Sequence, residues 1–442
     1  MILELLPEIV VGLGALLVLA TYPRWRLSKY LSFAILSISF LSLLLFSKPV
    51  SLFDDAFVID AFSTFFKILF LGISLLLVLS TTQKKVEFYS LLLFATLGMM
   101  IVASSKNLIL LFIAFELSSM STFAMVGLSK DKKAAEAALK FFLIGAISST
   151  LTLYGFTLIY SSLKTFYIPA ILDMKLTTIS SFGTIFVVAG FGFKMGVVPF
   201  HMWLPDTYQG AETSVTALLA SSSKKMGFAA TFRVLVALML LKDLTFVFVV
   251  LSVLTMTLGN VTALSQKNVK RMLAYSSIGH AGYILVGLAV LTPLGIAASM
   301  LHILAHAIMT FGAFIVVAIL ESNGWKIYED YVGLTRKAPL IAISMTIFLL
   351  SLTGIPPLIG FWGKFFLIVA AIQENMITLA IILILNSALS LYYYMRVVMY
   401  MFTSKESKSL VYPLTPRAVV IFSAILTFLL GIVPQRIIDY LL

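Results

Sequence analysis

The sequence predicts an all-α polytopic membrane protein, and its composition and hydrophobic pattern support this fold class. Hydrophobic residues make up 61% of the 442-residue chain and charged residues 11%, with a mean hydropathy of +1.07. Soluble domains carry about 25% charged residues. Apolar runs of about 20 residues recur from end to end, and each is long enough to cross a bilayer as a helix. A membrane β-barrel would instead require alternating segments of about ten residues.

About fourteen apolar segments are predicted to cross the membrane. Lysine and arginine concentrate in alternate loops, for example at Arg24 and Arg26, at Lys84 and Lys85, and at Lys130. Because cytoplasmic loops carry an excess of these residues, the alternation predicts a multi-pass protein of the plasma membrane with both termini on the outer side. The predicted segments are 2–20, 29–47, 57–80, 88–105, 107–128, 134–162, 178–199, 213–241, 244–264, 269–291, 294–320, 338–371, 376–402 and 416–434.

Two of these segments are predicted to be broken helices, one near Pro199 and one near Gly354–Pro357. A proline removes a hydrogen-bond donor, and such breaks persist at membrane depth only where protein or a wet cavity covers them. The breaks lie five segments apart, which predicts two inverted five-helix repeats of the kind found in transporters. Two proline kinks in an ordinary bundle are the alternative. The predicted parts are N-terminal helices in 1–87, a first repeat in 88–241, a second in 244–402 and a C-terminal helix in 416–442.

Several charged residues fall inside the predicted segments, where each lysine costs roughly 2.5–3.5 kcal/mol at the bilayer centre. Lys67, Arg233 and Arg396 can extend to the membrane interface through their long side chains. Lys194 lies just before the first break and Lys364 just after the second. The charged residues without an easy route to the interface are Glu116, Lys140, Lys194, Lys224 and Lys364.

Buried lysines beside a carboxylate are suited to proton transfer. Burial lowers the pKa of a lysine from about 10.4, and a neighbouring carboxylate reverses that shift. Glu116 and Lys194 are the predicted pair, with a static ion pair that fixes helix packing as the alternative. Lys224 and Lys364 would carry the proton onward, and Lys140 would flank the side of proton uptake.

The histidines add further candidates for proton transfer. His280 lies in the tenth predicted segment, where it would relay protons between Lys224 and Lys364 or simply pack against small neighbours. His302 and His306 are four residues apart and share one helix face, which favours a wet polar lining over a metal site. The sequence assigns no definite role to these two histidines, nor to the extra charge next to Lys224. The aromatic turn at 201–209 is expected to cap and seal the first broken helix, with a substrate site as the alternative.

Composition excludes several other kinds of function. The chain holds no cysteine, so it cannot bind an iron–sulfur cluster through thiolates, form a disulfide or use a thiol nucleophile. Its four histidines are too scattered to favour haem or zinc. The net charge of +12 lies in short loops rather than on a soluble face, which argues against nucleic-acid binding. We therefore predict that this chain itself binds no metal or cofactor.

Several motifs resemble a known family. These are KMGVVPFHMWLPDTYQGA, ALLASSSK, NVKRMLAYSSIGHAGY and GIPPLIGFWGKF. They resemble the antiporter-like membrane subunits of respiratory complex I, specifically the N subunit of NADH–quinone oxidoreductase and its mitochondrial counterpart, subunit 2. DTYQGA together with EAALKFFLIGAISSTLTLYG is closer to that subunit than to the L and M subunits or to sodium/proton antiporter subunits. The resemblance is strong over residues 106–367.

The resemblance implies fourteen helices with inverted repeats, and it implies roles for individual residues. The L and M subunits often have a lysine where this chain has Thr310, which favours the N subunit, although His306 is closer to the L and M pattern. By resemblance, proton transfer falls to the fifth-helix glutamate, the lysines of the sixth, seventh, eighth and twelfth helices and the tenth-helix histidine. In this sequence those residues are Glu116, Lys140, Lys194, Lys224, Lys364 and His280.

The function implied is that of a proton-translocating membrane-arm subunit of a complex I-type oxidoreductase. Quinone reduction elsewhere in the complex would drive proton transfer here, with the quinone, FMN, iron–sulfur clusters and NADH (or a ferredoxin or F420-type donor) bound by partner subunits. The expected partners are the other membrane-arm subunits and the lipid bilayer. A cation/proton antiporter subunit is the main alternative. A purely structural membrane subunit is a third possibility, and the buried charges argue against it.

Overall fold

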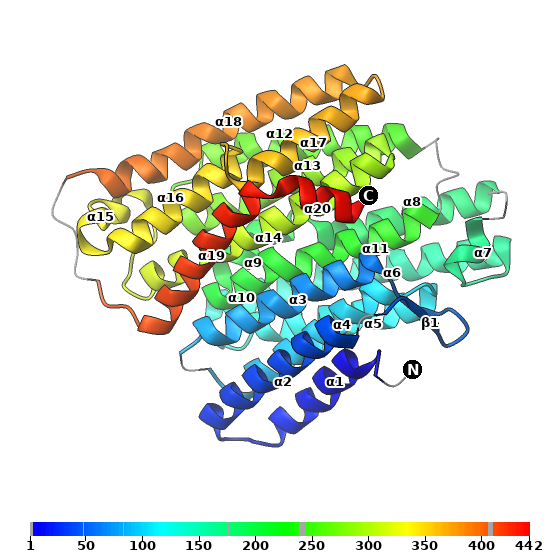
Figure 1. The fold of residues 1–442 in the computed structure, drawn as a ribbon, viewed down its shortest axis with the longest axis horizontal. Helices are drawn as coiled ribbons and strands as arrows, with labels where there is room; N and C mark the ends of the chain where they lie inside the picture. The colour runs from blue at the N-terminus through cyan, green and yellow to red at the C-terminus, as the bar shows by residue number, and fades with distance from the viewer. Residues whose placement is uncertain are drawn as a thin grey trace. The chain divides into compact units, whose positions relative to one another are not determined.

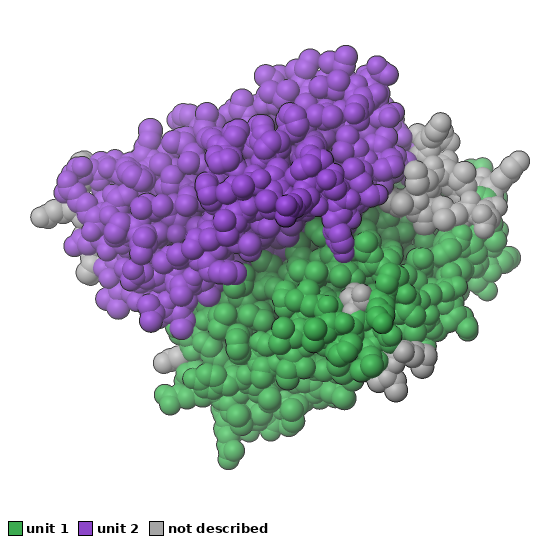
Figure 2. Space-filling view, in the orientation of Figure 1, with its two compact units in different colours: residues 1–195, 222–242 green, residues 196–221, 243–442 purple. Residues whose placement is uncertain are grey.

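The structure is a computed structural model, and it describes residues 3–46, 48–82, 84–172, 174, 177–237, 244–404 and 410–442. Its regular structure is almost entirely helical, with one short β-hairpin near the N-terminus (Figure 1). The chain forms two compact units (Figure 2). Unit 1 contains residues 1–195 and 222–242, and unit 2 contains residues 196–221 and 243–442. The predicted all-α membrane fold is confirmed.

Unit 1 is built around α4, which packs against α1, α3 and α5. The hairpin pairs its strands antiparallel, with Val50 opposite Ile59. Helix α6 packs along α8, and α8 also contacts α11. The elements of this unit are α1 Leu6–Leu19, α2 Trp25–Phe46, β1 Val50–Leu52, β2 Phe57–Ile59, α3 Ala61–Ser80, α4 Val86–Ser104, α5 Leu108–Val126, α6 Lys132–Leu163, α7 Ile168–Leu172, α8 Thr178–Met195 and α11 Lys224–Ala237.

Unit 2 is built around α13 and α14, which pack against each other and against α17. Its first helices, α9 and α10, lie against α13 and α14 respectively. The π-helical segment η1 joins α10 to α11 of unit 1. The elements are α9 Trp203–Gly210, α10 Thr213–Leu218, η1 Leu219–Ser223, α12 Thr245–Leu264, α13 Val269–Val290, α14 Pro293–Glu321, η3 Tyr328–Tyr331, α15 Leu334–Lys337, α16 Pro339–Thr353, α17 Ile359–Gln373, α18 Ile377–Phe402, α19 Leu414–Ile432 and α20 Pro434–Leu441.

Within the described residues, 11 helices are long and apolar enough to cross a membrane. The shorter apolar helices α1, α16 and α17 add to them. Each predicted segment overlaps a helix or a pair of helices, and the last residues of segment 213–241 lie outside the described part of the chain. The number of membrane crossings stays a prediction.

Burial differs sharply among these helices. The most apolar stretches of α13 and α14 are 94% and 89% buried, whereas those of α2 and α6 are 33% buried. Large apolar side chains such as Leu41, Leu44 and Leu45 of α2 are exposed. Because a helix in lipid satisfies its own backbone and gains from apolar surroundings, this exposure is what a lipid-facing helix requires.

Polar residues at the loop junctions fix where several helices begin. The side chain of Asp60 accepts a hydrogen bond from the Ser63 amide and forms a capping box at the start of α3. Asn107, Asp131 and Asn268 each accept first-turn amide hydrogen bonds at α5, α6 and α13. Such caps satisfy backbone donors that the helix leaves unpaired, and each is typically worth about 1 kcal/mol.

The two predicted helix breaks are present. Helix α8 ends at Met195, and Gly196 follows with a φ of +64°. Helix α16 ends at Thr353, and Gly354 follows with a φ of +94° before α17 begins. Residues other than glycine rarely adopt such positive φ values, so the glycines permit the chain to turn directly out of each helix.

Lys67 is paired with a carboxylate that the sequence did not identify as its partner. Its ammonium lies 2.6 Å from the Glu8 carboxylate, and its side chain is completely buried between α1 and α3. Arg233 also has a carboxylate partner, because its guanidinium donates to both oxygens of Asp60 at 2.7 and 2.6 Å. Each pair ties together helices of unit 1 through charge rather than through apolar contact alone.

Removing one member of the Lys67–Glu8 pair leaves an unpaired charge in an apolar site. We expect Lys67→Met to lower the free energy of unfolding by about 3–5 kcal/mol, because breaking a buried pair is far more costly than replacing it. Thermal unfolding of the purified protein in mild detergent measures the loss. The double variant Glu8→Gln/Lys67→Met should recover most of it. A double variant as unstable as Lys67→Met would contradict the charge-pair explanation.

Candidate functional site

Lys194 lies in the last turn of α8 and is 1% exposed. Its ammonium donates hydrogen bonds to Ser119 Oγ at 3.2 Å and Thr122 Oγ1 at 3.4 Å, both on α5. It also lies 5.4–6.0 Å from the centroids of three phenylalanine rings, a range in which ring faces attract cations. Hydroxyls and rings therefore stabilise this buried charge. The rings belong to Phe115, Phe123 and Phe141.

Glu116 occupies the same stripe of α5, one turn before Ser119. The residues Glu116, Ser119 and Thr122 are spaced by three, which places them on one helix face. Glu116 is half-buried, and its Oε1 accepts a hydrogen bond from Ser149 Oγ of α6 at 2.6 Å. The Glu116 and Lys194 charges interact electrostatically within this cluster. The structure thus brings the predicted pair into one cluster, with the Ser119 hydroxyl bound directly to the ammonium.

Lys224 and Lys225 begin α11 directly after the π-helical segment, and both are almost completely buried. Single π-helical turns occur frequently at functional sites. Successive residues of a helix point about 100° apart, so the two ammonium groups leave α11 in different directions. The burial of Lys225 matches that of Lys224, and the sequence assigned it no role.

Gly227 brings α11 against α8 beside Lys194. A Cβ atom at this position would lie 3.0 Å from the Met195 backbone nitrogen and 3.1 Å from the Lys194 Cβ. Thr231, one turn later on α11, donates to the Met195 sulfur at 3.4 Å. The glycine therefore allows the helix that carries Lys224 to pack against the backbone next to Lys194.

Lys140 is not buried. The sequence had placed it among the charged residues without an easy route to the interface. Its side chain is 44% exposed on α6 and lies 2.7 Å from Glu136, four residues earlier on the same helix. Nothing in the hydrophobic pattern of α6 distinguishes its exposed face from its buried one, because lipid-facing and core-facing residues are both apolar in a membrane. Glu136 is thus the partner of Lys140 on this helix, and the sequence did not identify it as one.

Lys364 of α17 lies at the second helix break and is 4% exposed. Its ammonium donates to the carbonyl oxygens of Leu352 and Thr353 and to Ser387 Oγ, each at 2.9 Å. The two carbonyls belong to the last turn of α16, where helix termination leaves carbonyls without an intrahelical donor. A cavity of about 300 Å³ adjoins the ammonium, with Phe361, Ser387 and apolar residues of α18 in its lining.

The three histidines of α13 and α14 form one cluster, which the sequence did not predict. His280 Nδ1 lies 3.1 Å from His302 Nε2, and the two rings stack with an interplanar angle of 11°. The ring of His306 lies 4.6 Å from that of His280, centroid to centroid, and hydrogen bonds to Thr310. The four-residue spacing in the sequence indicated that His302 and His306 share one face of a helix. That His280 contacts this face follows only from the packing of α13 against α14.

Tyrosines connect the histidine cluster to Lys364. The ammonium of Lys364 lies 4.7 Å from the centroid of the Tyr283 ring, which packs edge-on against His280 at 5.3 Å. On the other side of the cluster, His280 Nε2 lies 3.3 Å from the Tyr394 hydroxyl. Tyr283 also accepts a hydrogen bond from Asn260 at 2.8 Å. Ring contacts thus connect Lys364 to the histidines through Tyr283, and a hydrogen-bonding contact connects His280 to Tyr394.

The predicted aromatic turn at 201–209 is partly helical. Its residues form α9, and Asp206 and Gln209 both bind the guanidinium of Arg271 on α13, at 2.8 and 2.9 Å. Lys270, the preceding residue, donates to the Ala211 carbonyl at 2.7 Å. These contacts hold the segment after the first break against α13. Its capping and sealing role stays a prediction.

Among the described residues, no group of three or more His, Asp or Glu side chains has a geometry that could hold a metal ion. Two clusters of buried hydrogen-bonding and titratable side chains stand out in the described part of the chain. One surrounds Lys194 in unit 1, and the other extends from His306 to Lys364 in unit 2. Both are suited to holding and passing protons.

The fold and these clusters define a class of protein: a polytopic helical membrane subunit with titratable groups at membrane depth. The chain belongs to the family described as NADH:quinone oxidoreductase/Mrp antiporter, TM, whose sequence profile matches residues 105–390.

Relatives and a solved structure match nearly the whole chain and support its membership of this family. F(420)H(2) dehydrogenase subunit N of Methanosarcina mazei is 44% identical over 89% of this chain and 85% of its own length. NADH-quinone oxidoreductase subunit N of Trichlorobacter lovleyi is 39% identical over 99% and 95%. A chain of respiratory complex I from Thermus thermophilus superposes with a TM-score of 0.88 and 31% identity, covering 98% of both chains. The predicted resemblance to subunit N is confirmed.

The contact between α11 and α8 depends on Gly227 having no side chain. We expect Gly227→Ala to lower the free energy of unfolding by about 1–3 kcal/mol, because the added methyl would lie 3.0 Å from both the Met195 backbone nitrogen and the Met195 Cγ, and the backbone cannot move aside as a side chain can. The matched control is Gly72→Ala in α3, where the added methyl lies 4.0 Å from Phe40, an ordinary contact distance. Unfolding in detergent compares the two variants. Equal stability would show that α11 is not packed this closely.

Proposed function

We propose that this chain is a proton-translocating membrane-arm subunit of a complex I-type oxidoreductase. The observation that carries the proposal is the burial of Lys194, Lys224 and Lys364, each at most 4% exposed, within apolar helices of a member of this family. A charge at this depth is costly and marks ion pathways in membrane proteins. The names and lengths of the subunit N relatives support the same function.

In unit 1, the Lys194 cluster is proposed to store a proton whose affinity depends on Glu116. The ammonium donates to two hydroxyls that do not change their charge, and the charged group that acts on its protonation is Glu116. A carboxylate favours the protonated lysine, and a change in its charge or distance favours release. Lys224 and Lys225 of α11 are proposed as the next acceptors, because α11 packs against α8 at Lys194.

In unit 2, the histidine cluster and Lys364 are proposed to carry the proton further. Neutral imidazole both donates and accepts, so His280 can pass a proton between His302 and the Tyr394 hydroxyl. The cavity beside Lys364 is large enough for several water molecules, which would link its ammonium to neighbouring groups. Lys140, with its exposed side chain, is proposed to flank the side of proton uptake.

The partners and cofactors follow from the same proposal. Quinone, FMN, iron–sulfur clusters and the electron donor are proposed to be bound by partner subunits, with this chain holding no redox centre. The names of two relatives differ in their donor, NADH in one and F(420)H(2) in the other, so they leave the donor of this chain undecided. The alternation of basic loops supports a plasma-membrane location with both termini on the outer side.

The chain is proposed to contain two inverted repeats, each of which carries one of the two clusters. Each cluster contains a lysine within a few residues of a helix break, and each break contains a glycine of positive φ. A cation/proton antiporter subunit is the second candidate function, because the family description includes the Mrp antiporter.

Substitutions in the first cluster should separate electron transfer from pumping. We expect Glu116→Gln and Lys194→Met to lower proton translocation by the assembled complex at least about tenfold, as is typical when a proton-transferring group is lost. Proton uptake by vesicles during quinone reduction measures this effect. Lys140→Met should lower it less, since its ammonium is exposed and already paired on its own helix.

The control is Lys337→Gln, which removes one exposed positive charge far in sequence from either cluster. It should assemble and pump like the unmodified complex. Full pumping by an assembled Glu116→Gln complex would refute the role of this carboxylate.

The histidine cluster makes a separate prediction. We expect His280→Phe to lower proton translocation by at least about tenfold while the complex still assembles, because phenylalanine fills the space without passing protons. Tyr394→Phe, which removes the hydroxyl that contacts His280, should give a smaller loss. Normal pumping by His280→Phe would indicate a packing role.

The overall proposal is tested by purification from native membranes in mild detergent and identification of the co-purifying chains. Partners that carry iron–sulfur clusters and reduce quinone would support it and would identify the donor. Purification with small hydrophobic subunits alone, together with sodium-dependent proton flux, would instead establish the antiporter function.

A further inference from the structure

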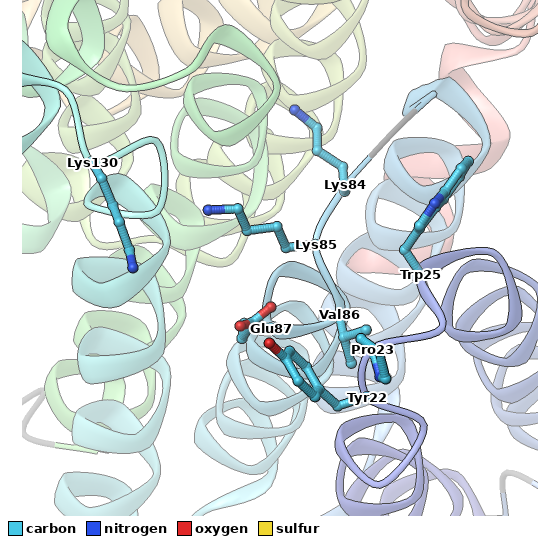
Figure 3. Close-up of a pocket in the computed structure, with 8 residues that line it drawn as sticks. All are labelled: Tyr22, Pro23, Trp25, Lys84, Lys85, Val86, Glu87 and Lys130. Carbon is cyan, nitrogen blue, oxygen red and sulfur yellow. The ribbon is translucent and has the colours of Figure 1, made fainter.

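A pocket of about 500 Å³ lies at one end of unit 1, and its lining contains none of the residues assigned to proton transfer. Three loops form it: those between α1 and α2, between α3 and α4, and between α5 and α6. The basic loops that the sequence places on the inner side of the membrane therefore meet at this end. The pocket is lined by Tyr22, Pro23, Trp25, Lys84, Lys85, Val86, Glu87 and Lys130 (Figure 3).

The charge of the pocket is positive, since it contains three lysines and one carboxylate. Figure 3 shows Lys84 and Lys85 extending toward the side where Lys130 stands, whereas Trp25 stands on the opposite side. Burial lowers the pKa of Lys84 to about 8, and a bound anion would favour its charged form. Glu87 offsets one of the three positive charges.

The start of α4 adds to the positive potential. Lys85 occupies the N-cap position, where a side-chain oxygen normally accepts hydrogen bonds from the first-turn amides. Lysine has no acceptor atom, and α4 begins without a side-chain cap. The positive end of the helix dipole thus points toward the same pocket as three ammonium groups, an arrangement that an anion would stabilise.

The surroundings of the pocket are those of a membrane interface. Tyr22 is 67% exposed beside it, and Trp25 lines it; both residue types concentrate where lipid headgroups lie. Exposed apolar side chains lie on both sides of Tyr22 in the sequence. They are Leu16 and Leu19 on α1 and Leu27 on α2. A molecule bound here meets positive charge at one end and an apolar helix surface at the other.

We propose that this pocket binds the phosphate headgroup of an anionic phospholipid, whose acyl chains lie along the exposed faces of α1 and α2. The ammonium groups of Lys84, Lys85 and Lys130 and the first-turn amides of α4 bind the phosphate oxygens. Trp25 and Tyr22 contact the glycerol region. This site does not depend on the proposed proton transfer.

A lipid fits these observations better than an acidic peptide or free phosphate. The apolar exposure next to the pocket provides a surface for acyl chains, and neither alternative ligand would use it. Basic clusters at the cytoplasmic ends of membrane helices attract anionic lipids, and the pocket gives that attraction a defined location.

The test uses the full-length protein in its purified native assembly, washed free of lipid with detergent and reconstituted in phosphatidylcholine vesicles. Spin-labelled phosphatidylglycerol and spin-labelled phosphatidylcholine report the relative affinity for anionic and zwitterionic headgroups. The pocket variant is Lys84→Gln/Lys85→Gln/Lys130→Gln. The control variant, Lys326→Gln/Arg336→Gln/Lys337→Gln, removes the same amount of charge from exposed positions of unit 2.

We expect the affinity for phosphatidylglycerol relative to phosphatidylcholine to fall by about tenfold or more in the pocket variant. Each lysine near a membrane surface usually adds to the attraction for anionic lipid, and this variant removes three. The control variant should keep the preference. An unchanged preference in the pocket variant, or an equal loss in the control, would overturn the proposal. Displacement of the labelled phosphatidylglycerol by inorganic phosphate alone, at equal concentration, would show a free-anion site and overturn the lipid assignment.

Discussion

The cost of placing an ammonium ion in hydrocarbon constrains this structure more than any other single factor. Each such charge needs enough hydrogen-bond acceptors or ring faces to replace its lost water. Lys194 obtains them from two hydroxyls of α5 and three phenyl rings, and Lys364 from the carbonyl end of α16. Lys67 obtains a full counter-charge from Glu8. Each solution requires a particular helix to lie close, so the charges also determine which helices pack together.

The sequence predicted much of the fold because its signals are local. The apolar runs identify the helices, and Pro199 and the Gly354–Pro357 segment identify the breaks. A positive-φ glycine followed by proline terminates a helix whatever packs around it. The buried states of Lys194, Lys224 and Lys364 were predictable for the same reason, since each lies well inside an apolar run.

The contacts between helices were not predictable, because in lipid both faces of a helix are apolar and periodicity no longer distinguishes them. Lys140 therefore looked as buried as Lys194, yet its side chain is 44% exposed. Lys67 looked able to reach the interface, yet α1 supplies Glu8 as its partner. The His280–His302 contact depends on the rotation of α13 relative to α14, which a single sequence does not specify.

The hydrogen bonds around Lys364 depend on whether its amine is protonated. A protonated amine has three hydrogens, and the structure gives it three acceptors: the carbonyls of Leu352 and Thr353 and the hydroxyl of Ser387. The neutral amine has two hydrogens and a lone pair, so loss of the proton leaves one acceptor without its donor. Ser387, which now donates to the Thr353 carbonyl, can turn its hydrogen toward that lone pair only by abandoning the carbonyl. Every departure of a proton from Lys364 must therefore change the hydrogen bonds among its amine, Ser387 and the carbonyls at the end of α16.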